Sequence, residues 1–258
     1  MSTHERANDA SFNNVTYQRC QFAYEYAQPY IQGKKVLDVG CGLAFGTSYM
    51  ANHASEITGM DYDAITIRAN RKNYQSQRNI AFIEGRIPPL NFPDETFEVI
   101  TSFQFIEHIH KRKEFIKEAH RVLKKGGVLL LSTPNSKMSL ARNPFHVHEY
   151  TFKEMKNEVT SIFRDFDLVG LNGNEKVNKY YHENGKWVHK ILKWDVLGLH
   201  KIIPAKLLMM PYNLVTNRMR SKLMQQVSET SDINTKDFFL EKKNLDASWD
   251  IYLIARKN

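Results

Sequence analysis

The chain has 258 residues, 42% apolar and 25% charged, a composition typical of a soluble globular domain that excludes disordered, collagen-like and coiled-coil chains. Its 36 basic and 28 acidic residues give a net charge of +8, which permits a polyanionic partner or a membrane surface without choosing between them. No apolar run is long enough to span a bilayer, and residues 1–14 lack the apolar core of a secretory signal. The two cysteines, Cys20 and Cys41, lie outside any CxxC motif, which predicts reduced thiols in a cytoplasmic protein.

Short apolar runs alternate with longer amphipathic ones along the first half of the chain. The predicted strands are 35–39, 56–60, 80–83, 97–102 and 128–132, with a last strand at 250–255. The predicted helices are 45–53, 63–74 with Asp63 as its N-cap, and 113–123, which the basic, glycine-containing run 124–127 ends. Strands that alternate with helices indicate a parallel sheet covered on both faces. We therefore expect one α/β domain over residues 1–258, with a doubly wound, mostly parallel sheet.

The alternation of strands and helices stops between residues 172 and 234, where the apolar residues recur at helical spacing and the net charge is positive. Residues 176–226 hold ten lysines or arginines against two acidic residues, an excess equal to the net charge of the chain. We expect a helical cap inserted before the last strand, which closes over a ligand pocket as a lid. Two alternatives stay open: peripheral membrane contact through residues 187–224, with Trp187 and Trp194 in the interface, and helix-mediated dimerisation.

The most informative motif is the run 36–46, Val-Leu-Asp-Val-Gly-Cys-Gly-Leu-Ala-Phe-Gly. A buried strand leads into Gly40 and Gly42 and then into a helix, and the glycines let the backbone turn sharply and approach a ligand. In an open parallel sheet, ligands bind at the carboxyl ends of the strands. The motif therefore predicts a site for a nucleotide-like molecule, although a tight turn without a ligand has the same pattern.

Two acidic residues narrow the choice of ligand. Asp38 lies at the end of the first strand, where a dinucleotide site keeps an apolar residue, and a carboxylate there suits an ammonium group. Asp61 ends the second strand, 21 residues beyond Gly40, where a carboxylate accepts both ribose hydroxyls. The third glycine, Gly46, misses the dinucleotide spacing by one position. A ribose and an ammonium without a pyrophosphate indicate S-adenosylmethionine.

The motifs resemble those of the class I S-adenosylmethionine-dependent methyltransferases over about residues 17–170. The similar segments, in the order of that family, are 36–42, 59–63, 97–100, 106–109 and 121–127. Ser132-Thr-Pro-Asn135 and Phe145-His-Val-His-Glu149 are similar to a subgroup of small-molecule methyltransferases often associated with cell-surface glycan synthesis. The resemblance implies a Rossmann-like sheet of seven strands, the last antiparallel. It also implies methyl transfer to a small-molecule or glycan acceptor, most readily a hydroxyl oxygen and conceivably one that is lipid-linked.

The resemblance also implies which residues hold the cofactor. The turn formed by Gly40, Cys41 and Gly42 would contact the methionine part, with Asp38 near its amino group and Asp61 on the ribose. The thiol of Cys41 is interpreted as a small packing group rather than a nucleophile.

The adenine would be held by the segments that follow the next strands. The resemblance places Tyr62 along the adenine, Arg86 and Ile87 at its edge, and Phe103 or Gln104 along the cofactor. Arg86 departs from the family, which often has an aspartate that accepts from the adenine amino group. Because arginine has no acceptor, adenine recognition would rest on backbone groups.

A second departure lies in the glycine motif. Ala44 stands where the family most often has glycine, and Gly46 is the residue we expect to supply the close approach instead.

Several acidic and histidine residues are candidates for the chemistry. Methyl transfer from a sulfonium depends on alignment, and a hydroxyl nucleophile gains from a general base. The candidates are Glu107, His108, His110, His146, His148 and Glu149. Since histidine titrates closest to neutral pH, His108 and His146 are the preferred general bases, and Glu107 is a third candidate for a catalytic role. The alternative is that these residues only shape the loop after the fourth strand. No set of ligands has metal-binding spacing, so we expect no metal.

Two rival functions remain open. A basic enzyme of this class suits RNA or DNA, but Ser102-Phe-Gln-Phe105 lacks the Asp/Asn-Pro-Pro-Tyr motif of amino-directed DNA enzymes, and no cysteine follows the fourth or fifth strand. The other rival is a non-catalytic partner protein that binds S-adenosylmethionine, a reading that Ala44 and Arg86 favour. The sequence leaves the acceptor, the methylated atom and the oligomeric state undetermined.

Overall fold

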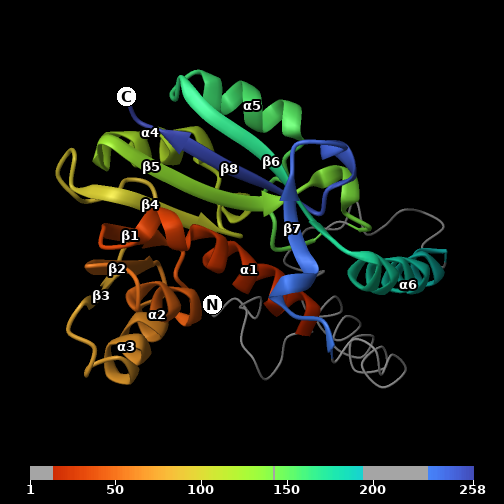
Figure 1. Ribbon diagram of the computed structural model, residues 1–258, viewed down its shortest axis with the longest axis horizontal. Coiled ribbons are helices and arrows are strands. Elements are labelled where there is room, and N and C mark those ends of the chain that lie inside the picture. Colours follow the sequence, from red (N-terminus) through yellow and green to blue (C-terminus); the bar gives the residue numbers. More distant parts are fainter. Residues whose placement is uncertain (1–13, 142, 194–231) are drawn as a thin grey trace.

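The computed structural model describes residues 14–141, 143–193 and 232–258. Within these ranges an eight-stranded sheet has the strand order β3-β2-β1-β4-β5-β8-β6-β7 (Figure 1). The strands are β1 (Lys35–Val39), β2 (Glu56–Asp61), β3 (Ile80–Glu84), β4 (Phe97–Phe103), β5 (Leu123–Pro134), β6 (Asp165–Gly173), β7 (Phe238–Glu241) and β8 (Asp250–Arg256). The helices are α1 (Asn14–Ile31), α2 (Phe45–Ala51), α3 (Ala64–Asn73), α4 (Arg112–Val122), α5 (Phe152–Thr160) and α6 (Glu175–Leu192).

The sheet is doubly wound, as the sequence predicts. The first strand, β1, lies in the middle of the sheet. The next two strands, β2 and β3, follow on one side of it, and β4 and β5 on the other, with all five strands parallel. The last strand, β8, is antiparallel to both β5 and β6, which also agrees with the expectation. The structure adds an eighth strand, β7, which pairs antiparallel with β6. A run of four residues has too little pattern to predict a strand, and only its pairing partner makes it one.

Alternate residues of the strands face two separate cores. On β1, Val36 packs with α1 and α2, whereas Leu37 and Val39 pack with α4 and α5 on the other face. The same alternation continues on β4, where Val99 and Ile100 lie in different cores. Because both faces are covered, the carboxyl ends of the parallel strands are the edge left for ligands, as in other open α/β sheets.

The end of α4 differs slightly from the prediction. The helix stops at Val122, and the run 124–127, expected to follow the helix as a terminator, belongs to the irregular start of β5. The pairing between β4 and β5 changes register between Phe97 and Val99, which accommodates this extra length. The strand therefore begins immediately after the helix.

The predicted cap, 172–234, connects β6 and β7, two strands that pair with each other. The part of it described by the structure is helical, since α6 spans Glu175–Leu192. This helix buries Val177 and Tyr180 in a small core with Val15 and Phe238. Residues 194–231, which include Trp194 and most of the proposed membrane-contact segment, lie outside the described residues. No helix among the described residues combines the length and apolar character needed to cross a bilayer.

Candidate active site

The glycine turn after β1 lies at the carboxyl edge of the sheet. The backbone N–H groups of Gly40 and Cys41 both donate to the Met60 carbonyl, at 2.8 and 3.0 Å, which ties the turn to the end of β2. Gly40 and Gly42 have φ of +80° and +50°, a region that side chains with a Cβ rarely adopt. A Cβ on Gly40 would lie 2.5 Å from the Phe105 ring, whereas one on Gly42 would have no atom of the described residues within 4 Å. The open side of the turn is therefore at Gly42.

Asp38 is a buried carboxylate next to this turn. Its side chain accepts hydrogen bonds from the Thr47 hydroxyl at 2.6 Å and the Thr101 hydroxyl at 2.9 Å, and the residue is 1% exposed. Burial raises the pKa of Asp38 to about 6, although the two threonine hydroxyls oppose the rise. Two neutral donors leave its charge without a cationic partner among the described ion pairs. The position therefore fits a ligand that brings an ammonium group.

Asp61 holds the other side of the turn. Its carboxylate accepts the backbone N–H of Gly42 and that of Asp63, each at 3.0 Å. These bonds fix the orientation of the carboxylate, and each oxygen keeps further acceptor capacity for the two hydroxyls of a ribose. Tyr62, the next residue, is 48% exposed beside it. The sequence-predicted ribose carboxylate thus lies within hydrogen-bond distance of the glycine turn.

The residues expected around the adenine have different surroundings. Arg86 is exposed and Ile87 is half-buried at the start of the loop after β3. The ring of Phe103 is in the core, with its centroid 4.9 Å from that of Tyr24. Gln104 is half-buried, has a φ of +53° and donates its backbone N–H to the Ser132 carbonyl. Of the two side chains predicted to line the cofactor, Gln104 is the one not packed in the core.

The glycine motif is also shaped by packing. Cys41 is buried in a small core with Ala44, Ile67 and Phe82, in agreement with its interpretation as a packing residue. Ala44 has a left-handed backbone with φ of 64°. A Cβ on Gly46 would lie 2.0 Å from the Tyr24 ring, so the space there is filled by α1. Gly46 therefore makes room for helix packing, not for the close approach to a ligand that the sequence analysis assigns to it.

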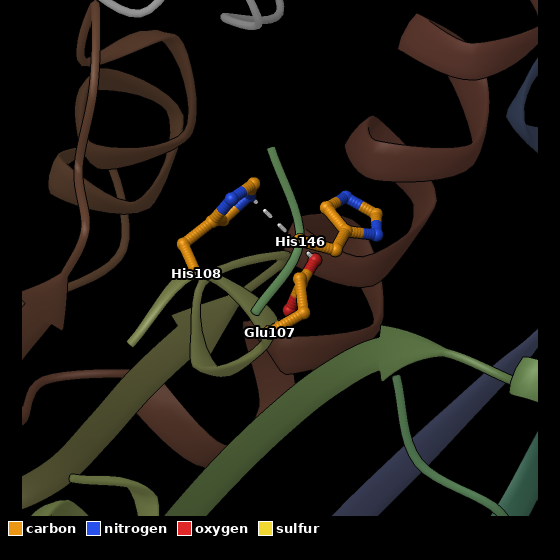
Figure 2. Close-up of side chains that lie close together, drawn as sticks. All are labelled: Glu107, His108 and His146. Carbon is orange, nitrogen blue, oxygen red and sulfur yellow. Dashed lines mark ion pairs between the residues drawn. The ribbon is translucent and has the colours of Figure 1, made fainter. Parts of the chain in front are cut away.

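The loop after β4 carries the second group of candidate residues (Figure 2). Glu107 is 1% exposed, and its Oε2 accepts a hydrogen bond from Thr133 of β5 at 2.9 Å. Its Oε1 has no hydrogen-bond partner among the described residues and lies 4.0 Å from Nε2 of His108. His146 lies beside them, and its ring centroid is 4.9 Å from that of His108. The three preferred candidates thus form one cluster.

Backbone hydrogen bonds hold the two segments of this cluster together. The Glu107 carbonyl accepts the N–H groups of Val147 and His148, at 2.7 and 3.2 Å. Nδ1 of His108 is 3.0 Å from the Phe145 carbonyl, so this nitrogen carries the proton in the neutral ring and donates it. The tautomer leaves the lone pair on Nε2 of His108, which is the atom that faces Glu107.

His146 is oriented by a carboxylate. Its Nδ1 lies 2.5 Å from Oε1 of Glu149, and its Nε2 lies 2.9 Å from the amide nitrogen of Asn143. Burial opposes ionisation of Glu149, but hydrogen bonds from His146 and Ser139 outweigh it and lower the pKa of that carboxyl. The sequence analysis names Glu149 only as a possible base. The spacing of three residues between His146 and Glu149 was the available signal for the pair.

The side chains of the other two histidine candidates have different surroundings. His148 packs its ring against Tyr150, and its Nε2 lies 3.8 Å from Glu154. His110 is exposed. The fold therefore selects His108 and His146 from the histidines that the sequence offers.

A buried ion pair that sequence reasoning missed lies behind Glu107. Nε of Arg19, on α1, is 3.3 Å from Oδ2 of Asp250, the first residue of β8. Burial raises the pKa of Asp250 to about 6, with Arg19 opposing the rise and Glu107 adding to it. Asp250 pairs in register with Pro134 at the end of β5, which carries it to the ligand edge of the sheet. The sequence gives no signal for its partner on the first helix.

Comparisons with known proteins show what the chain as a whole is similar to. Residues 37–131 match the family described as "Methyltransferase domain". A probable S-adenosylmethionine-dependent methyltransferase of Mycolicibacterium smegmatis is 34% identical over 164 residues, which are 61% of this chain and 63% of that one. A ubiquinone biosynthesis O-methyltransferase of Pseudomonas aeruginosa is 32% identical over 117 residues, 44% of this chain and 47% of that one. The chain thus matches less than two thirds of the length of either relative. Among solved structures, the cyclase SpnF has the same fold, with a TM-score of 0.60 at 15% identity over 98% of this chain and 86% of that one.

Proposed function

We propose that this chain is a class I S-adenosylmethionine-dependent methyltransferase, with S-adenosylmethionine as its methyl donor, and that it methylates a hydroxyl oxygen of a small-molecule or glycan acceptor. The buried, cation-free carboxylate of Asp38 and the fixed carboxylate of Asp61 support the placement of the cofactor across the open side of Gly42. When bound there, S-adenosylmethionine supplies a methyl group already activated by the positive charge of its sulfur.

The observation that carries the proposal is the position of the Glu107, His108 and His146 cluster next to the glycine turn, residues 40–42. Strands β1 and β4 are neighbours in register, with Asp38 opposite Thr101, so the loops that follow them lie side by side. Phe105 contacts the backbone of Gly40, and Glu107 follows two residues later. A hydroxyl held at this cluster is therefore close to the turn that we assign to the methionine part of the cofactor.

We assign the role of base to Nε2 of His108. Its Nδ1 is held by the Phe145 carbonyl, whereas both nitrogens of His146 have partners in Glu149 and Asn143. His108 would accept the proton of the hydroxyl as the new O–CH3 bond forms and the S–CH3 bond breaks, with its electron pair left on sulfur. Glu107, with Oε1 at 4.0 Å, would stabilise the imidazolium. A positioned base of this kind contributes about 10²–10⁴-fold in rate.

Two observations favour an oxygen acceptor of this class. The Pseudomonas aeruginosa relative is named as an O-methyltransferase. The segments 132–135 and 145–149, which resemble the glycan-associated subgroup, form the walls of the cluster, since Thr133 binds Glu107 and Phe145 binds His108. In this proposal the helical segment 172–234 is a cap that sets acceptor choice.

The proposal is tested by screening sugar nucleotides, lipid-linked sugars and quinols for formation of S-adenosylhomocysteine, with the methylated atom located by NMR. His108→Asn should lower kcat by about 10²–10⁴-fold without changing cofactor affinity. His53→Asn is the matched control, because that residue precedes β2 at the opposite end of the strands. Cofactor binding without turnover of any acceptor would favour a non-catalytic partner protein. Methylation of RNA or DNA alone, with salt-dependent binding, would favour the nucleic-acid alternative.

A further inference from the structure

We propose that Glu107, His108 and His146 form a binding site for one divalent transition-metal ion of the zinc class. Each residue offers one ligand atom, and the three atoms lie within 4.8 Å of one another. Two imidazoles and one carboxylate are a ligand set that suits zinc and its neighbours in the first transition row, but not magnesium, which prefers oxygen alone. With three protein ligands, a tetrahedral ion would keep a fourth position for another ligand.

The carboxylate of Glu107 is the observation that points to a ligand. It is buried, and only Oε2 is satisfied, by the Thr133 hydroxyl. Oε1 has no hydrogen-bond partner among the described residues and faces Nε2 of His108. A buried carboxylate oxygen without a partner carries a desolvation penalty, which a bound cation would remove.

The surrounding hydrogen bonds prepare both histidines as neutral ligands. Nδ1 of His108 donates to a backbone carbonyl, and Nδ1 of His146 is held by the carboxylate of Glu149. Metal-binding histidines almost always donate their second nitrogen to a carbonyl or carboxylate in this way. The lone pair of each ring is then on Nε2. At His146 the metal would replace the amide of Asn143, which now lies 2.9 Å from Nε2.

The distances and charges also favour a cation. Ligand bonds of about 2.0–2.2 Å place tetrahedral ligands about 3.3 Å apart. The present gap of 4.0 Å between Glu107 and His108 closes with a side-chain shift of less than about 1 Å. Among the described residues, the carboxylates of Glu107 and Glu149 and the guanidinium of Arg19 all act on the carboxylate of Asp250. The local excess of negative charge is available to a metal ion.

The role of the metal rests on the proposed function, but its binding does not. The role of base assigned to Nε2 of His108 is its role in the metal-free protein. With the ion bound, the same lone pair would be a ligand, and the ion would acidify a hydroxyl at the fourth position, whose proton would pass to solvent. The sequence analysis expected no metal because no set of ligands has metal-binding spacing, and His146 is distant in sequence from Glu107 and His108. Backbone hydrogen bonds from Val147 and His148 to Glu107 are what bring it into place.

The test is calorimetric titration of the full chain with Zn²⁺ alone, after treatment with a chelator. We expect one tight site per chain, no comparable binding of Mg²⁺, and visible absorption bands when Co²⁺ is added. Glu107→Gln should weaken Zn²⁺ binding more than about 100-fold, and Glu149→Gln by about 10–100-fold, as is typical of a residue that orients a ligand. Asn143→Ala should bind Zn²⁺ at least as tightly as the parent. His110→Asn, an exposed histidine close in sequence, should leave the affinity unchanged.

The outcomes separate this inference from the proposed function. Failure of the parent protein to bind Zn²⁺, or equal binding by folded Glu107→Gln, overturns the metal site even if methyl transfer occurs in the presence of chelator. Zinc binding that Glu107→Gln removes supports the site even if no acceptor is methylated. The Co²⁺ spectrum reports on the ligands directly, so a folded variant that keeps the spectrum also counts against its residue as a ligand.

Discussion

Asp61 gives the sharpest test of the cofactor site. We expect Asp61→Asn to weaken the binding of S-adenosylhomocysteine by about 10–150-fold, since a hydrogen bond to a charged group is worth about 1.5–3 kcal/mol and each 1.4 kcal/mol is a factor of ten. The substitution keeps the size of the side chain but removes its charge. The carboxylate is held by two backbone N–H groups at 3.0 Å, so its oxygens are already oriented before the ligand arrives. Ligand binding therefore does not have to order the Asp61 side chain, and the full hydrogen-bond free energy contributes to affinity.

The same substitution should lower stability, and the two effects must be separated. The new amide nitrogen would face the N–H of Gly42 or that of Asp63, two donors in contact, at a cost of about 1–3 kcal/mol. Affinity is therefore measured by calorimetry at a temperature where thermal unfolding shows the variant to be folded. Asp63→Asn is the matched control, because Asp63 caps α3 and asparagine caps equally well. A folded Asp61→Asn protein that binds as tightly as the parent would refute the ribose assignment.

Three further predictions concern the fold that supports the site. For Asp38, the raised pKa of about 6, against an ordinary 3.8, means that its contribution to stability is complete below pH 4 and is lost as the pH rises through 6. Denaturation curves between pH 4 and 7 should show a loss of stability that is about 3 kcal/mol smaller in Asp38→Asn than in the parent, because Asp250 contributes to the loss in both proteins. Gly46→Ala should destabilise by about 1–3 kcal/mol or more because its Cβ would overlap the Tyr24 ring at 2.0 Å. Gly185→Ala, in a helix with 3.6 Å to the nearest side chain, should instead stabilise by about 0.5–1 kcal/mol, and equal effects would contradict the packing argument. Arg121→Lys should cost about 1–3 kcal/mol in urea unfolding, because lysine cannot reproduce the fork that donates to the carbonyls of Leu90 and Phe92; a loss below about 0.5 kcal/mol would count against that role.

The sequence alone determined the parallel sheet and the edge of the sheet at which the glycine turn, Asp38 and Asp61 lie. Apolar runs such as 35–39 and 128–132 are long enough to be read as buried strands, and the glycines at 40 and 42 mark where the first one turns. Asp38 and Asp61 could be placed without coordinates because each ends a strand, and the ends of parallel strands meet at one edge. The prediction failed where the signal was short, as for β7, or where packing decided the outcome, as for Gly46 and Tyr24.

Only the tertiary structure decided which candidate side chains meet. The sequence offered six acidic or histidine residues in two segments, and it preferred His108 and His146 without showing that they lie beside Glu107. Hydrogen bonds from Val147 and His148 to the Glu107 carbonyl turn His146 toward Glu107, while His148 packs against Tyr150. The pairing of Arg19 with Asp250 likewise joins the first helix to the last strand. Hydrophobic period and turn residues are short-range properties that a sequence displays directly, whereas such contacts depend on distant segments that come together only when the chain folds.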